Sequence, residues 1–156
     1  MHECIIQLDT TPFDHKDDLM TIDDFISDFD WFVPERADYV DEYDDENEMH
    51  EAIKSALDRP GLKYAGGKLT IISKEAYFLD RYNVFLKLVR DACKWSLDDF
   101  INGKKWIELR DLNDLYEDEL GTCVVDGSGL KTLDDLIRYS KNGDEFYVGS
   151  ALDYHW

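Results

Sequence analysis

The chain has little of what usually marks a secreted or membrane-spanning protein. Its three cysteines, Cys4, Cys93 and Cys123, lie far apart and form no CxxC pair. They therefore predict free thiols in a reducing compartment rather than a disulfide framework. Apolar runs are only a few residues long, too short for a transmembrane helix, and the first residues lack the basic and apolar parts of a signal peptide. We expect a cytoplasmic protein.

Signatures of catalysis and of cofactor binding are also missing. The chain has no GxSxG, P-loop or GxGxxG pattern. His50-Glu51 begins like a zinc-protease motif, but Lys54 stands where the second histidine belongs. Asp126-Gly-Ser-Gly129 resembles the middle of a calcium-binding loop, yet Val124 and Asp135 occupy its first and twelfth ligand positions. We expect a turn there, and no catalytic residue, metal site or cofactor.

Acidic residues are what the chain has in excess. Its 36 Asp and Glu stand against 17 Lys and Arg, a formal net charge of −19. Such a chain is expected to meet a positively charged partner, because nucleic acid and anionic lipid would repel it. Adaptation to high salt would also explain the acidity, but 11 lysines against 6 arginines show no depletion of lysine. The apolar share of 44% is sufficient for a folded core.

The charge is unevenly distributed along the chain. Residues 1–60 carry a net −15, residues 61–110 a net +4 and residues 111–156 a net −8. The densest stretch, 23–51, holds 13 acids and one base. Along a helix these charges would lie about 3.6 Å apart, close to the roughly 3.4 Å spacing of phosphates on one DNA strand, although Pro34 breaks such a helix.

This stretch predicts a surface for a basic partner. The residues that we expect to bind it are Asp28, Asp30, Asp38, Tyr39, Asp41, Glu42, Tyr43, Asp44, Asp45, Glu46 and Glu48. Carboxylates would steer association, and aromatic side chains would supply affinity. Tyr39 and Tyr43 are expected at the surface, whereas Trp31 and Phe32 are expected in the core.

The leading hypothesis is a non-catalytic inhibitor that masks a basic, nucleic-acid-binding protein such as a nuclease, as anti-restriction and immunity proteins do. One alternative is a small metal-dependent enzyme that uses clustered carboxylates. Another is an accessory or assembly subunit, with a homodimer formed through oppositely charged faces. The simplest alternative is a solvated acidic face with no partner.

Local patterns predict a single α+β domain over 1–156. The pattern [ST]-[IL]-Asp-Asp-[FL]-Ile begins at Thr21, Ser96 and Thr132, and each copy is typical of a capped helix start. Both ends of the chain predict a strand, a loop, a short capped helix and a second strand, with Trp31-Phe32 beginning that second strand in the first half. The segment 34–47 is expected to be a mobile acidic loop.

The middle of the chain predicts a helix, a hairpin and a longer helix. The helix covers 45–58, and the hairpin joins 62–65 to 68–72 through Gly66-Gly67. The long helix, about 74–95, is expected to pack against a small, mostly antiparallel sheet. Its basic stripe, Lys87, Arg90 and Lys94, is expected to face the acidic segments of the same chain.

Overall fold

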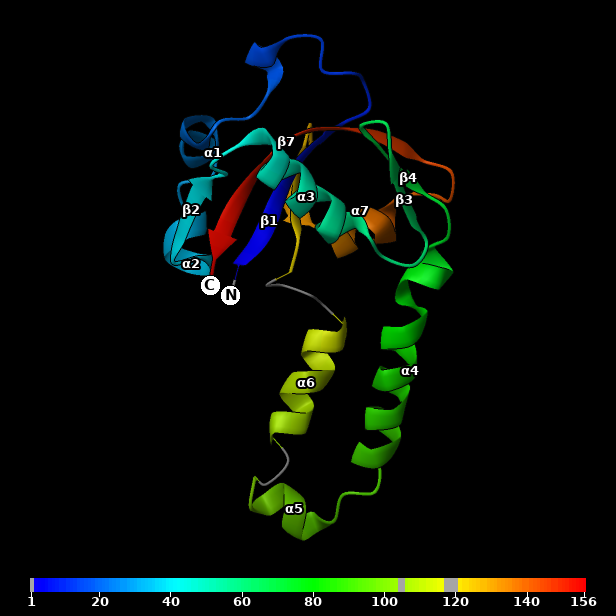
Figure 1. The fold of residues 1–156 in the computed structure, drawn as a ribbon. Coiled ribbons are helices and arrows are strands. Elements are labelled where there is room, and N and C mark those ends of the chain that lie inside the picture. Colours follow the sequence, from blue (N-terminus) through cyan, green and yellow to red (C-terminus); the bar gives the residue numbers. More distant parts are fainter. Residues whose placement is uncertain (1, 104–105, 117–120) are drawn as a thin grey trace.

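A seven-stranded, mostly antiparallel sheet organises the α+β fold (Figure 1). The computed structural model describes residues 2–103, 106–116 and 121–156. The strands are β1 (His2–Asp9), β2 (Tyr39–Glu42), β3 (Leu62–Ala65), β4 (Lys68–Ile71), β5 (Cys123–Asp126), β6 (Gly129–Thr132) and β7 (Glu145–His155). The order is β3-β4-β7-β1-β5-β6, and β2 also pairs with β7. Among these described strands, only β1 and β5 pair in parallel.

Helices pack around this sheet and extend beyond it. They are α1 (Ile22–Asp28), α2 (Phe32–Arg36), α3 (Glu46–Leu57), α4 (Lys74–Ala92), α5 (Leu97–Ile101), α6 (Trp106–Tyr116) and α7 (Leu133–Tyr139), with a short 3-10 helix, η1 (Lys16–Asp18). Side chains alternate along β1 and so divide the core into two clusters. Ile6 belongs to the cluster that includes residues of α3 and α7, and Ile5 to the cluster that includes Phe25 of α1 and Phe32 of α2.

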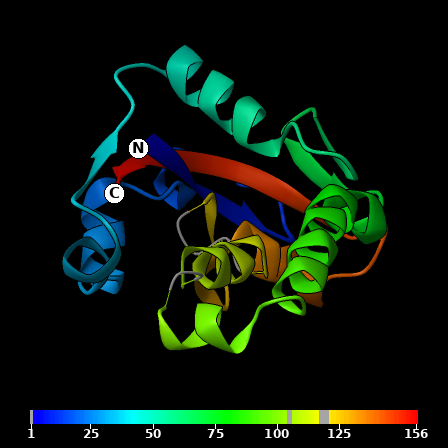
Figure 2. The same ribbon diagram turned by 90° about the horizontal axis from the view of Figure 1, so that it is seen from below.

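The helices α4, α5 and α6 form an arm that projects from the sheet (Figure 1). Seen from below in Figure 2, α4 and α6 point along the line of view, and α5 lies at the ends of the arm that are furthest from the sheet. The expected long helix is therefore present as α4. Only Tyr77 of α4 is fully buried in the core, and much of the apolar surface of the helix faces α6 instead.

A buried carboxylate fixes the base of the arm. Asp134 of α7 is 3% exposed; its two oxygens accept hydrogen bonds from the Tyr77 hydroxyl at 2.8 Å and from Arg81 Nη1 at 2.6 Å. Burial, together with this carboxylate, raises the pKa of Tyr77. Nearby, the Arg138 guanidinium lies 4.8 Å from the centre of the Phe78 ring and also covers the ring of the last residue of α6. The helix α7 therefore holds both long helices of the arm.

The capping predictions are confirmed. Thr21, Ser96 and Thr132 each accept a hydrogen bond from the backbone N–H three residues later, at 3.1–3.2 Å. The 62–72 hairpin is present, and both turn glycines have positive φ, 59° and 71°. The predicted 45–58 helix is α3, with Asp45 as its N-cap. Capping side chains and turn glycines therefore determine where these helices begin and where the hairpin turns.

Other local predictions were wrong. Trp31-Phe32 begins α2 instead of a strand, because Phe32 packs in the α1–α2 core cluster. The segment 34–47 is not a plain loop, since it contains the end of α2, the strand β2 and the cap of α3. The Asp126 turn joins β5 to β6, a strand that we did not predict. Among the described residues, no helix is both long and apolar enough to cross a membrane.

Candidate acidic binding groove

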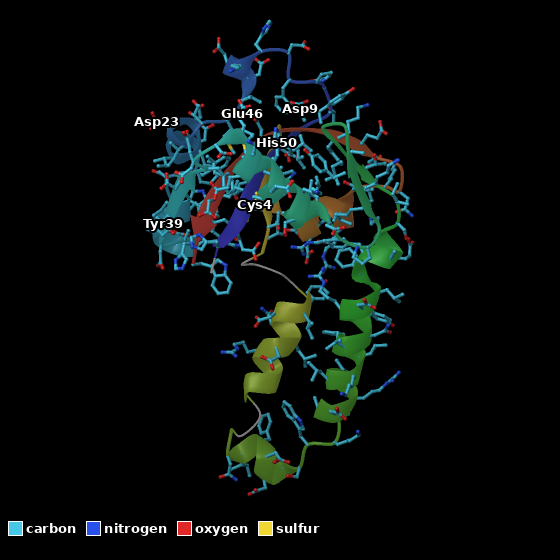
Figure 3. The ribbon with its side chains drawn as sticks, viewed as in Figure 1. Cys4, Asp9, Asp23, Tyr39, Glu46 and His50 are labelled. Carbon is cyan, nitrogen blue, oxygen red and sulfur yellow. The ribbon has the colours of Figure 1, made fainter. Side chains whose placement is uncertain are left out.

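A groove of about 810 Å³ lies between β2, α3 and the ends of β1 and β7. Its lining residues are His2, Glu3, Cys4, Tyr39, Asp41, Glu42, Tyr43, Asp44, Glu48, Glu51, Ala52, Ser55, Ala56, Arg59 and Asp153. Figure 3 shows Tyr39 on β2, Cys4 on β1 and His50 on α3, three of the elements that surround it. Residues far apart in the sequence therefore share one hollow.

The strand β2 brings its alternate side chains to this groove. Tyr39 pairs with His155 of β7, and Asp41 pairs with Asp153. Between them, Val40 is 7% exposed and packs in the α1–α2 core cluster. Because side chains on a strand alternate between faces, burial of Val40 directs its two neighbours to the opposite side. Asp41 therefore faces the groove, whereas Glu42 lies on the Val40 face, where it accepts a hydrogen bond from the Ile22 N–H of α1 at 3.2 Å, and only borders the groove.

The helix α3 supplies the opposite wall. Residues 48, 51, 52, 55 and 56, spaced as one face of an α-helix, line the groove. Ile53 and Leu57 are fully buried on the other face. Asp45 begins the helix by accepting hydrogen bonds from the N–H groups of the second and third helical residues at 2.8 and 2.9 Å. The cap and the two buried side chains therefore orient Glu48 and Glu51 toward the groove.

A thiol and a phenol form the floor. Cys4 is buried, and burial raises the pKa of its thiol to about 12, although a hydrogen bond with Tyr43 partly opposes the increase. Burial, and secondarily Cys4, raises the pKa of Tyr43 as well. Both groups are neutral near pH 7, so the floor adds no charge. The expected exposure of Tyr43 was wrong, since its ring packs against the core.

The rim combines Asp38 with three residues from the two ends of the chain, His2, Asp153 and His155. His2 Nδ1 lies 2.8 Å from Asp153 Oδ2, and His155 Nδ1 lies 3.1 Å from Asp38 Oδ2. The rings of Tyr39 and His155 stack with centres 5.4 Å apart and planes 8° apart. The 43% exposure of Tyr39 confirms the predicted surface position. An aromatic face therefore lies beside the acidic wall.

Negative charge dominates the lining. Seven carboxylates line the groove, and the only Lys or Arg among the lining residues is Arg59. Arg59 Nε donates to the Ala56 carbonyl at 3.0 Å and its Nη2 donates to Thr122 Oγ1 at 3.2 Å, which holds the guanidinium at the end of the wall. A concave surface of one charge sign concentrates the electrostatic field and attracts cations. The described residues contain no group of three or more His, Cys, Asp or Glu suited to hold a metal ion.

The structure gathers most, but not all, of the residues predicted to bind a partner. Those that line the groove are Tyr39, Asp41, Glu42, Tyr43, Asp44 and Glu48. Asp45 and Glu46 line an adjoining hollow of about 340 Å³. Asp38 lies on the rim, bonded to His155. Asp28 ends α1 and Asp30 follows it, and both lie outside the two hollows.

Aromatic side chains of the acidic stretch are divided between core and surface. Phe25 and Phe32 are each 1% exposed and pack inside the sheet–helix core. The prediction for Phe32 is thereby confirmed, whereas that for Trp31 was wrong, because its side chain is 39% exposed. Of the six aromatic residues in the stretch, Tyr39 is the exposed one that lines the groove.

Several groove residues have no local signal in the sequence. His2, Cys4 and Asp153 come from strands at opposite ends of the chain, and only the pairing of β1 with β7 brings them together. Glu51 belongs to the acidic stretch 23–51, but no residue next to it in the sequence separates it from the other acids of that stretch. Its position three residues after Glu48 on α3, on the face opposite Ile53, could have identified it.

The expected position of the basic stripe was wrong. Lys87, Arg90 and Lys94 are exposed on the arm, which points away from β2 and α3 (Figure 1). Lys94 instead pairs with Asp91, near the end of α4, at 2.7 Å. The acidic groove is therefore not neutralised by this stripe.

Comparison with protein-family models found no match, and neither did comparison with curated proteins or with solved structures.

Proposed function

We propose that this chain is a non-catalytic binding protein whose acidic groove masks the basic, nucleic-acid-binding surface of a cytoplasmic partner protein. The observation that carries the proposal is the concentration of seven carboxylates in one groove. Lysine and arginine side chains of such a surface normally meet phosphates, and carboxylates can take the place of phosphates as acceptors. Occupation of that surface would exclude nucleic acid and so inhibit the partner.

The built geometry supports specific recognition rather than diffuse attraction. Asp41 and Asp153 lie opposite each other on paired strands, and α3 holds Glu48 and Glu51 on one face. Acceptors on strands and helices keep their positions when a partner approaches, so little ordering entropy opposes binding. The exposed ring of Tyr39 offers a surface for stacking by an arginine guanidinium.

Matched charge variants test this proposal. Asp41→Asn/Glu51→Gln removes two groove charges, whereas Asp14→Asn/Asp17→Asn removes two charges from the exposed segment around η1. Each protein would be used to capture partners from lysate at low salt, followed by elution with duplex DNA. The proposal predicts basic, DNA-displaceable proteins on wild type and on the η1-segment variant but not on the groove variant.

Equal recovery on both variants would show that net charge, rather than the groove, binds these proteins. Recovery of no basic or nucleic-acid-binding protein on any of the three would contradict the proposed partner class. The alternative of a carboxylate-based metal enzyme gains no support from the described side chains.

A further inference from the structure

One face of α4 carries an apolar seam of which three members are exposed and two, Leu86 and Val89, are half-buried. The seam residues are Leu79, Tyr82, Leu86, Val89 and Cys93, and their spacing alternates between three and four. This spacing is the a and d pattern of a coiled-coil helix. Leu79 and Tyr82 are 53% and 55% exposed, and Cys93 is exposed as well.

A neighbouring seam of the same helix is already used. Phe85 lies one position before Leu86 and packs toward Tyr116 of α6, with ring centres 6.5 Å apart. Ala92, seven residues later, continues that internal seam on the same side of the helix. Two adjacent seams on one helix are typical of a helix that has two neighbours along its length. Among the described residues α6 packs along α4, and α7 contacts α4 at its base through Tyr77 and Arg81.

The charge distribution favours a second copy of the chain as the second neighbour. Residues 74–116 contain eight acids and eight bases, so the remainder of the chain carries the whole net charge of −19. Two copies would repel each other wherever their acidic parts meet, but not where their arms meet. The arm is thus the part of the chain on which a second copy can pack without net repulsion.

The same reasoning selects the orientation. Parallel arms would place the two acidic sheet regions side by side and would align Arg90 with its counterpart. Antiparallel arms would place the sheet regions at opposite ends of a helix of 19 residues, about 28 Å long and well beyond the Debye length of roughly 8 Å at physiological salt.

Antiparallel pairing would also cover exposed apolar residues at both ends of the arm. The tip, α5, carries Leu97, Phe100 and Ile101, each at least 70% exposed. Ile72 and Tyr139, near the base of the arm, are 53% and 87% exposed. In an antiparallel pair the tip of each copy approaches the base of the other.

We propose that the α4 seam is the interface of a homodimer in which the arms of two copies pack antiparallel. The interface involves no residue of the acidic groove, so each dimer presents two grooves at opposite ends. This inference does not depend on the proposed function.

Sedimentation equilibrium of wild type and two variants tests the proposal. Leu79→Asp places a charge in the seam, whereas Val84→Asp places the same charge on the opposite flank of α4, where Val84 is 48% exposed. Similar exposure makes the two substitutions comparable in their cost to folding, which circular dichroism would verify. We expect wild type to dimerise with a Kd on the order of 10–100 µM, Leu79→Asp to weaken the dimer at least about tenfold, and Val84→Asp to change it by less than about twofold.

Salt and oxidation distinguish this dimer from other self-association. An apolar seam between neutral arms keeps or gains affinity as salt rises, because screening reduces the repulsion between sheet regions. Loss of the dimer at high salt would indicate instead that the arm of one copy binds the groove of another, and would overturn the proposal.

A Cys93–Cys93 disulfide formed on mild oxidation would show parallel arms, since antiparallel packing separates the two thiols by about 20 Å along the helix axis. A monomeric wild type, or equal effects of the two aspartates, would also refute the interface.

Discussion

Replacement of Asp134 by alanine tests how the arm is attached to the sheet. The 3% exposed carboxylate accepts from Tyr77 and Arg81, and it belongs to the third copy of the Asp-Asp helix-start pattern. Asp23 occupies the same position of the first copy but is exposed on α1. The two substitutions therefore remove the same side chain from the same sequence context, and they differ in burial and partners.

The expected cost follows from those partners. A hydrogen bond to a charged group contributes about 1.5–3 kcal/mol, and two such bonds are lost at Asp134. The Arg81 side chain is 24% exposed, so water can partly solvate the guanidinium that is left without its carboxylate. We therefore expect Asp134→Ala to lower the free energy of unfolding by about 3 kcal/mol. Asp23→Ala removes chiefly a favourable interaction with the helix dipole and should cost about 0.5 kcal/mol.

Urea unfolding followed by tryptophan fluorescence would measure both values. A double-mutant cycle with Arg81→Ala should give a coupling energy of at least about 1 kcal/mol with Asp134. If Asp134→Ala costs no more than Asp23→Ala, or if the coupling is absent, the buried pair does not anchor the arm and the reasoning is refuted.

Three further predictions use the same kind of matched comparison. Gly61→Ala should lower the free energy of unfolding in urea by at least about 3 kcal/mol, because a Cβ would lie 2.0 Å from a backbone oxygen. Gly66 also has positive φ but open space around it, so Gly66→Ala should cost about 1 kcal/mol. Equal costs would show that the close approach at Gly61 is unimportant. Mass spectrometry after alkylation at pH 8 should find the exposed Cys93 modified. Cys4 should stay unmodified until the protein unfolds, because it is buried and burial raises the pKa of its thiol to about 12. Rapid modification of Cys4 in the native protein would contradict this. Hydrogen bonds from the hydroxyl and the N–H of the cap residue Thr21 lower the pKa of Asp24 from 3.8. The contribution of Asp24 to stability is therefore complete above pH 3.8 and is lost as pH falls through the lower pKa of the folded state. Asp24→Ala should lose part of the wild-type acid dependence of stability below pH 3.8, and an unchanged dependence would refute the capping role.

The sequence predicts this fold best where local chemistry decides the structure. Helix starts at Thr21 and Thr132 and the turn at Gly66 need only neighbouring residues, and all three are correct. The strand β2 was missed because Val40 is its one buried residue, and a single apolar position gives no alternating pattern. The pattern also could not show that Asp134 is buried, because its partners lie on α4.

The candidate site was predictable in composition but not in shape. An excess of carboxylates pointed to the right segment, since β2 and α3 supply most of the groove lining. It could not separate Asp41, which lines the groove, from Asp28, which does not, because only strand pairing and helix phase distinguish them. His2 and Asp153 became groove residues through the pairing of the two ends of the chain, a contact of high sequence separation that leaves no local signal.

The most direct test of the central claim is the affinity of a captured basic partner for the groove and η1-segment variants, measured by calorimetry across a range of salt. Each lost groove charge should cost about 1 kcal/mol, so Asp41→Asn/Glu51→Gln should raise Kd by about 30-fold and reduce the salt dependence. Asp14→Asn/Asp17→Asn, which removes the same net charge, should change Kd by less than about threefold. Equal losses for the two variants would contradict a binding site in the groove and would show that the partner responds only to the overall charge of the chain.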